Sequence, residues 1–260
     1  MENVIQSQLD PNYVPPEYAI PYDVLELPSQ GIVYPNKKST VKVEFLTAFD
    51  ETVLTSPNIS NSNNLLDILI KRKVKELGFD PLDLLVSDRV AILLFLRTTA
   101  FGPNYTQLVV DGDGDIKEGE IDLSNLKQKK LTVKPDNDGL FDFTLPNSKK
   151  NIKFKFLTGR DELDIDLVDK NYISKNVDNT SNKLFFRMEK QIHSIDGITD
   201  KIKLSNILKA QFSLVDSRKL RSYIDEIEPG IDFNTVARFP GGGTVKTFLR
   251  FNTSFFFPDI

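Results

Sequence analysis

An eleven-residue segment of this chain occurs twice without a gap, and it constrains the fold more than any other feature. Residues 41–51 read VKVEFLTAFDE and residues 152–162 read IKFKFLTGRDE. Each copy alternates apolar and polar residues as a half-buried strand does, and then has a Thr three positions before an Asp-Glu pair. Thr can cap a helix, and acids in the first turn complement the positive end of the helix dipole. The pattern predicts a strand that leads into a helix at Thr47 and at Thr158.

The surroundings of the two copies are also alike. Leu27-Pro28 precedes the first copy and Leu145-Pro146 precedes the second. Downstream, LVSDR at 85–89 is similar to LVDSR at 214–218, with Asp and Ser exchanged. Duplication of one unit explains these likenesses, and convergence of two strand-to-helix junctions is the alternative. Duplication predicts superposable units near residues 25–110 and 145–235.

Helical and extended periods alternate along the rest of the chain. Helices are expected at 61–77, 81–100, 161–172, 183–194, 201–212 and 216–227. Strands are expected at 41–45 and 151–157, in short pieces over 104–145, and again over 231–257. The sequence predicts an α+β fold of two related units, each an antiparallel β segment followed by helices and a β-hairpin. The expected divisions are an extended Pro-rich arm at 1–22, a first unit with a β-rich insert at 23–144, and a second unit with a C-terminal hairpin at 145–260.

Composition excludes several classes of function. The chain has no Cys, which rules out disulfides, thiolate nucleophiles, iron-sulfur clusters and cysteine zinc sites. Its net charge of -4 disfavours phosphate backbones and anionic lipid, so nucleic acid and membrane surfaces are not expected as partners. The longest apolar stretch, residues 91–96, is far shorter than a membrane span.

The acidic segment Asp111, Asp113 and Asp115 is the sharpest candidate for metal binding, because alternating carboxylates can face one calcium ion. The full loop pattern fails, since an EF-hand needs Gly at its sixth position and Glu at its twelfth. This chain has Ile116 and Asp122 at those places. A solvated hairpin turn is therefore expected.

Three other features carry an ordinary structural interpretation. The glycines at 241–243 invite a phosphate cradle, but the P-loop spacing is absent and a hairpin tip is expected. The only histidine, His193, has no nucleophile elbow beside it and is expected on the surface at a helix end. A basic cluster, expected to complement a helix C-terminus or else to bind a partner, consists of Lys71, Arg72, Lys73 and Lys75. No catalytic, cofactor-binding or metal-binding residue is assigned, and no enzyme activity or cofactor is expected.

The two chain ends are expected to bind partners. Four prolines hold residues 1–22 extended and remove backbone donors, so this arm can lie along a neighbour. Three consecutive aromatic residues near the C-terminus cannot all face one core if they form a strand. The expected contact residues are Tyr13, Tyr18, Tyr22, Phe255, Phe256 and Phe257. The alternative is that the arm has no docking role and that the chain's own helices bury the C-terminal rings.

Short motifs spread along the chain carry a family resemblance. They are LPSQGIVYP at 27–35, LTAFDE at 46–51, DRVAILLFLR at 88–97 followed by Phe101-Gly102 and Tyr105, and FFFP at 255–258. In these the chain resembles the baseplate hub and hub-assembly proteins of T-even-like contractile-tailed bacteriophages, over most of its length from Leu25 onward. Related tail proteins often carry Cys pairs in zinc-ribbon-like hairpins. This chain has residues 111–115 and 240–243 at comparable turns, which it would close without metal.

The resemblance implies a structural protein of the phage tail baseplate that acts through protein-protein binding. Its partners would be other tail or baseplate proteins, with a homo-oligomer as one arrangement. Its location would be the virion tail, and the host cytoplasm during assembly. A transient assembly chaperone is the second hypothesis, distinguished by whether finished virions contain the protein. A hydrolase with an acidic metal site at Asp111, Asp113 and Asp115 is the third.

Overall fold

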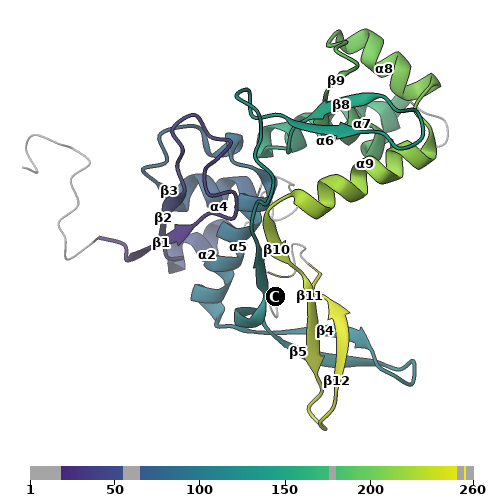
Figure 1. Ribbon diagram of the computed structural model, residues 1–260. Helices are drawn as coiled ribbons and strands as arrows, with labels where there is room; N and C mark the ends of the chain where they lie inside the picture. Colours follow the sequence, from purple (N-terminus) through teal and green to yellow (C-terminus); the bar gives the residue numbers. More distant parts are fainter. Residues whose placement is uncertain (1–18, 55–64, 176–179, 251–254, 256–260) are drawn as a thin grey trace, which may run out of the picture.

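The structure is a computed structural model that describes residues 19–54, 65–175, 180–250 and 255 of the 260. It has an α+β fold, as predicted, with helices beside antiparallel sheets. Figure 1 shows an N-terminal lobe, a C-terminal lobe and a pair of crossed hairpins that extend away from both. Of the helices described, none combines the length and apolar character that a membrane span requires.

The N-terminal lobe joins a three-stranded sheet to helices. The sheet has the order β1-β2-β3, with β1 Tyr22–Glu26, β2 Thr40–Glu44 and β3 Val74–Lys75. The helices are α2 Ala48–Leu54, α4 Leu65–Lys73, the 3-10 turn η2 Pro81–Asp83, and α5 Val86–Phe101. Helix α5 is apolar on more than one side, and it buries Ile92, Leu93 and Leu96 in the core.

The C-terminal lobe repeats this order of elements. Its sheet is β7-β8-β9, with β7 Phe141–Thr144, β8 Asn151–Phe154 and β9 Ile192–Ile195. Its helices are α6 Gly159–Lys175, α7 Lys183–Gln191, α8 Lys201–Ala210 and α9 Leu214–Ile227. Among the described residues of both lobes, two strands lead into two helices, a third strand, a short helical segment and a last long helix. Helices begin directly after Thr47 and Thr158, as predicted, whereas descent from one duplicated segment stays a prediction.

The same side-chain cap begins α2 and α6. Asp50 Oδ2 accepts from the backbone nitrogen and hydroxyl of Thr47, at 2.8 and 2.9 Å. Asp161 Oδ2 accepts from the same two groups of Thr158, both at 3.1 Å. Each cap satisfies backbone donors that the first helical turn would leave without partners.

The basic cluster expected at the end of a helix holds this cap in place. Lys73 is buried and pairs with Asp50, and Arg72 pairs with Asp50 at 3.1 Å. Burial raises the pKa of Asp50, but the hydrogen bonds from Lys73 and Thr47 together outweigh it, so the pKa lies below its ordinary value. In the second lobe Asp161 pairs with Lys155 at 2.6 Å, with the same net direction for its pKa. Removing either carboxylate would leave a cation without its partner.

The predicted alignment of LVSDR with LVDSR is shifted by one residue from the structural correspondence. Asp88 is the third residue of helix α5, and Asp216 is the third residue of helix α9. The two aspartates therefore correspond, and Asp and Ser are not exchanged. Asp88 Oδ1 accepts from the backbone nitrogen of Ser29 at 2.9 Å, and Asp216 Oδ1 accepts from that of Asn147 at 2.9 Å. Both donors directly follow a Leu-Pro pair.

Several expected helices end or divide early. The helix expected at 81–100 breaks at Leu84-Leu85, because these residues pair with the other lobe. Val86 N–H donates to the Leu157 carbonyl at 2.9 Å, and Gly159 N–H donates to the Leu84 carbonyl at 3.0 Å. The helices expected at 61–77 and 183–194 end at Lys73 and Gln191, where the chain continues into β3 and β9.

The expected divisions also move. Tyr22, placed in the arm, begins β1 and pairs with Glu44. Strand β7 pairs with β8, so the second sheet begins at Phe141, ahead of the division expected at 145. Two further strands, β6 Lys127–Lys129 and β10 Gly230–Asp232, pair across that division. Residues 1–18 lie outside the described part of the chain.

The crossed hairpins are β4 Asn104–Val110 with β5 Ile116–Asp122, and β11 Asn234–Arg238 with β12 Thr244–Phe248. They form a sheet in the order β12-β11-β5-β4, and the only register pair between them is Arg238 with Glu120. A Cβ at Gly119 would lie 2.9 Å from the side chains of Ala237 and Val109, so glycine permits the close crossing. Gln107 Nε2 on β4 also donates to the Phe248 carbonyl on β12 at 3.0 Å.

Candidate functional site

The outer face of the crossed hairpins gathers large apolar side chains that the chain covers only in part. Along β4, Tyr105, Gln107 and Val109 face the interior, and the residues between them face solvent. Exposed large apolar side chains on the two hairpins are Leu108, Val110, Ile116, Val236 and Phe248, with exposed fractions from 45 to 69%. A cluster of this kind on a rigid sheet is typical of a protein-binding surface.

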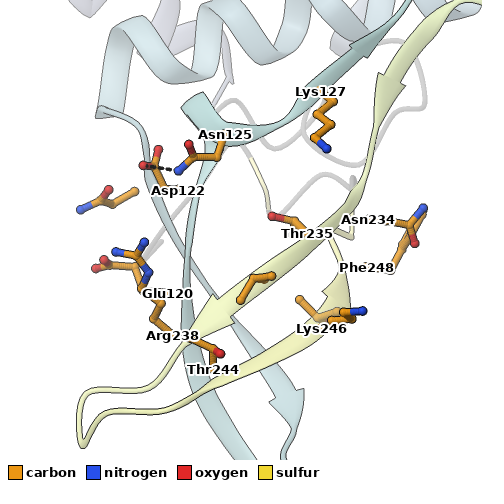
Figure 2. A pocket seen from close by; sticks show the side chains of 13 residues that line it. Glu120, Asp122, Asn125, Lys127, Asn234, Thr235, Arg238, Thr244, Lys246 and Phe248 are labelled. Carbon is orange, nitrogen blue, oxygen red and sulfur yellow. Dashed lines mark hydrogen bonds between the residues drawn. The ribbon is translucent and has the colours of Figure 1, made fainter.

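An open groove of about 1110 Å³ continues this face. Asp122 is the last residue of β5, Asn125 and Lys127 come from the segment that follows it, and the β11-β12 hairpin lies across from them (Figure 2). Asp122 is held in place by hydrogen bonds from the hydroxyl of Ser124 at 2.5 Å and from Asn125 Nδ2 at 2.7 Å. The remaining lining residues are Asn104, Glu120, Asn234, Thr235, Val236, Arg238, Thr244, Lys246, Thr247 and Phe248.

The two hairpins carry opposite charge. The β4-β5 hairpin, residues 104–122, has six acidic residues and one Lys. The β11-β12 hairpin, residues 234–248, has Arg238 and Lys246 and no acid. The face therefore joins an acidic hairpin to a basic one, with Glu120 directly opposite Arg238 where they meet, and both hairpins carry exposed apolar side chains among the charges. We call it the bipolar face.

The acidic turn at 111–115 closes the first hairpin. Asp111 Oδ1 accepts backbone N–H bonds from Asp113 at 3.0 Å and Asp115 at 2.9 Å, and Asp111 also pairs with Lys117. The hydrogen bond from Lys117 lowers the pKa of Asp111. This carboxylate is thus engaged by its own loop, and the described residues include no group of three or more His, Asp or Glu arranged around a metal position.

The glycines at 241–243 form the tip of the second hairpin, as expected. Gly242 N–H donates to the Phe239 carbonyl at 3.0 Å, and the φ of both Gly242 and Gly243 is +88°, in the left-handed region. This tip leads into strand β12 and not into a helix N-terminus.

His193 does not end a helix, because α7 stops at Gln191 and His193 lies exposed on β9. It borders a cavity of about 400 Å³ whose other walls come from α6, α7 and α8. Two acids of this cavity, Asp161 and Asp164, pair with Lys155 and Lys190, at 2.6 Å in each case. Apolar side chains and these ion pairs line the cavity together.

The structure separates the aromatic residues expected to bind partners. Phe255 is fully buried, with its ring 4.9 Å from that of Tyr105, so it belongs to the chain's own core. Tyr22, the first residue of β1, is exposed, and the Lys42 ammonium lies 3.9 Å from its ring centroid. The other four, Tyr13, Tyr18, Phe256 and Phe257, lie outside the described residues.

Residues of the family-like motifs meet in two buried clusters. In the first, the hydroxyls of Ser29 and Tyr34 both donate to Asp88 Oδ2 at 2.5 Å. Burial raises the pKa of Asp88 and of Tyr34. In the second cluster, Arg97 donates to the Phe255 carbonyl at 2.9 Å, and its guanidinium lies over the ring of Phe101 at 4.8 Å. Both clusters position loops and helix ends.

Sequence reasoning missed the bipolar face. The alternating pattern of its strands could be predicted from the sequence. The crossing of two hairpins about 120 residues apart decides which side of each strand stays exposed, and the pattern does not predict that crossing. The opposite charge of the two hairpins is visible in the sequence and could have indicated a binding surface there.

Comparison with protein-family models, with curated proteins and with solved structures finds no match for this chain.

Proposed function

We propose that this chain is a structural subunit of the tail baseplate of a contractile-tailed bacteriophage, of the hub or hub-assembly type, and that it acts by binding other proteins. The bipolar face is the observation that carries the binding role. The phage assignment rests on the motif resemblance. The expected setting is the virion tail, reached through assembly in the host cytoplasm with other tail or baseplate proteins as partners.

The apolar side chains of the bipolar face make association favourable. Each is already about half covered, so completing its burial contributes on the order of 1 kcal/mol. The strands that carry them are paired on a rigid sheet, so little conformational entropy is lost on docking. The flanking charges then favour a partner of matching pattern.

The buried motif clusters support this function by fixing where the face points. The Ser29-Tyr34-Asp88 cluster ties the loop between β1 and β2 to the start of α5. Arg97 ties the end of α5 to Gly102, just before β4, through a 3.3 Å hydrogen bond. The residues that carry the family resemblance thus form the scaffold under the docking surface.

The test is complementation in cells infected by a phage that lacks this gene. Wild-type protein should restore infectious particles, whereas Ile116→Asp should not, although its melting temperature stays unchanged. Ile202→Asp is the matched control, because Ile202 is 74% exposed on α8, away from the hairpins. Full rescue by Ile116→Asp would contradict the binding role of the face.

Mass spectrometry of purified virions decides between two forms of the proposal. A component of the finished tail identifies a baseplate subunit. A protein required for infectivity but absent from virions is an assembly chaperone.

A further inference from the structure

We propose that the bipolar face also pairs with the same face of a second copy of this chain, forming a two-fold symmetric dimer. This inference rests on the proposed function only in using the same docking surface, and it names one partner for that surface.

Both charged regions lie on one side of the sheet. Residues directly opposite in an antiparallel pair point to the same face, and so do residues two apart on a strand. Glu120 lies opposite Arg238 in the sheet register, and Glu118 is two residues before Glu120 on the same strand. On the other hairpin, Val236 is two residues before Arg238 and lies opposite Lys246. Glu118 and Lys246 therefore share this face, on opposite hairpins.

A two-fold rotation brings unlike charges together twice. The acidic hairpin of one copy then meets the basic hairpin of the other, and the reverse contact forms at the same time. Among the described residues neither Glu118 nor Lys246 makes an ion pair within the chain, so both are available. An interface of this kind is self-complementary without any change in the fold.

The same two-fold rotation brings the apolar side chains of one hairpin against those of the other hairpin in the second copy. Leu108, Val110 and Ile116 on the first hairpin would cover Val236 and Phe248 on the second hairpin of the other copy. Each of these side chains is only about half covered by its own chain, so the dimer would protect the exposed half from water.

The size of the face predicts a reversible dimer. Four strands at about 4.8 Å spacing, two of about 24 Å and two of about 17 Å length, give roughly 400 Å² per copy. Standard stable interfaces bury about 800 Å² per partner. We therefore expect association on the order of micromolar concentrations, weakened by salt because charge pairs contribute to it.

Sedimentation velocity of the full chain tests the dimer. Wild-type protein should shift from monomer to dimer with rising concentration at low salt. Glu118→Lys and Lys246→Glu should each weaken the dimer at least about tenfold, because like charges then meet twice. An equimolar mixture of the two variants should restore the dimer, since each reversed charge again meets its opposite. Controls of the same charge change elsewhere, Lys203→Glu and Glu226→Lys, should behave as wild type.

Two results would overturn the dimer: wild-type protein that stays monomeric at the highest concentration in low salt, or a mixture that stays as weak as its components. Its failure is distinguishable from failure of the proposed function. A monomeric chain whose Ile116→Asp variant still fails complementation has a docking face for another protein. A dimeric chain whose Ile116→Asp variant complements fully has a dimer without the proposed docking role.

Discussion

Asp88 and Asp216 occupy the same place in the two lobes. Each is the third residue of the last long helix of its lobe, and each accepts a backbone N–H at 2.9 Å from the loop between the first two strands. Both loops also close alike, through Leu27 N–H to Ser39 and Leu145 N–H to Lys150, at 2.8 and 2.9 Å. A carboxylate in the first turn complements the helix dipole while it holds the loop.

The environments of the two aspartates differ, and this gives a first prediction. The Tyr34 hydroxyl donates to Asp88 and accepts from Leu85 N–H at 2.9 Å, so Tyr34→Phe leaves the buried Leu85 N–H without a partner and removes one of the hydrogen bonds to Asp88, which keeps those from Ser29. We expect the free energy of unfolding to fall by about 1–3 kcal/mol. Urea denaturation measures it, and Tyr22→Phe at an exposed ring is the control. Equal stability of the two variants would mean that the hydroxyl makes no net contribution.

Much of this arrangement could be predicted from the sequence because it is encoded locally. The strand-to-helix junctions at Thr47 and Thr158 depend on residues within four positions, and they lie where predicted. The break at Leu84-Leu85 depends on a backbone pairing with Thr158, more than 70 residues away, so helical periodicity alone missed it. The register of Asp216 was misjudged because LVSDR and LVDSR share Leu, Val and Arg when aligned without a shift, whereas the two helices correspond one residue apart.

The candidate site was less predictable for the same reason. Phe255 reads as an exposed strand residue, but it packs on Tyr105, about 150 residues earlier in the chain. The bipolar face arises only when Gly119 lets two distant hairpins cross. Local patterns specify strands, whereas tertiary contacts decide which side of a strand remains free.

Stability should fall as pH rises through neutrality, because of Glu228 at the end of α9. Burial raises the pKa of this half-buried carboxyl to about 7, against an ordinary value of 4.5, although Arg187 and Lys129 act in the opposite direction. A raised carboxyl pKa means that the fold favours the protonated form. Its stabilising contribution is complete below about pH 4.5 and is lost as pH rises through about 7, amounting to at most ~3 kcal/mol.

Glu228→Gln tests this contribution. The variant should be more stable than wild type at pH 8 and nearly equal at pH 4.5, as measured by urea denaturation across that range. Glu226→Gln changes an exposed acid on the same helix and should leave the pH dependence intact. An unchanged pH profile in Glu228→Gln would assign the pH dependence to other groups.

Chelation should leave the melting temperature unchanged. The Asp111 carboxylate is already engaged by backbone N–H groups and by Lys117, so no metal is needed to hold the turn. Replacing the exposed Asp113 by Asn should alter the free energy of unfolding by less than about 0.5 kcal/mol. A fall of several degrees in EDTA, restored by calcium, would contradict this view of the turn.

The crossing of the hairpins should be sensitive to a single methyl group. In Gly119→Ala the new Cβ would lie 2.9 Å from Ala237 and from Val109, both rigid short side chains, so the strands must move apart. Overpacking of this kind costs about 1–3 kcal/mol. The shift would also separate Glu120 from Arg238 and distort the bipolar face, so dimerisation should weaken together with stability.

Gly241→Ala is the control, because a Cβ there meets nothing within 4 Å. Urea denaturation and sedimentation velocity on both variants provide the two measurements. If Gly119→Ala lost stability but dimerised as tightly as wild type, the dimer contact would have to lie away from the crossing.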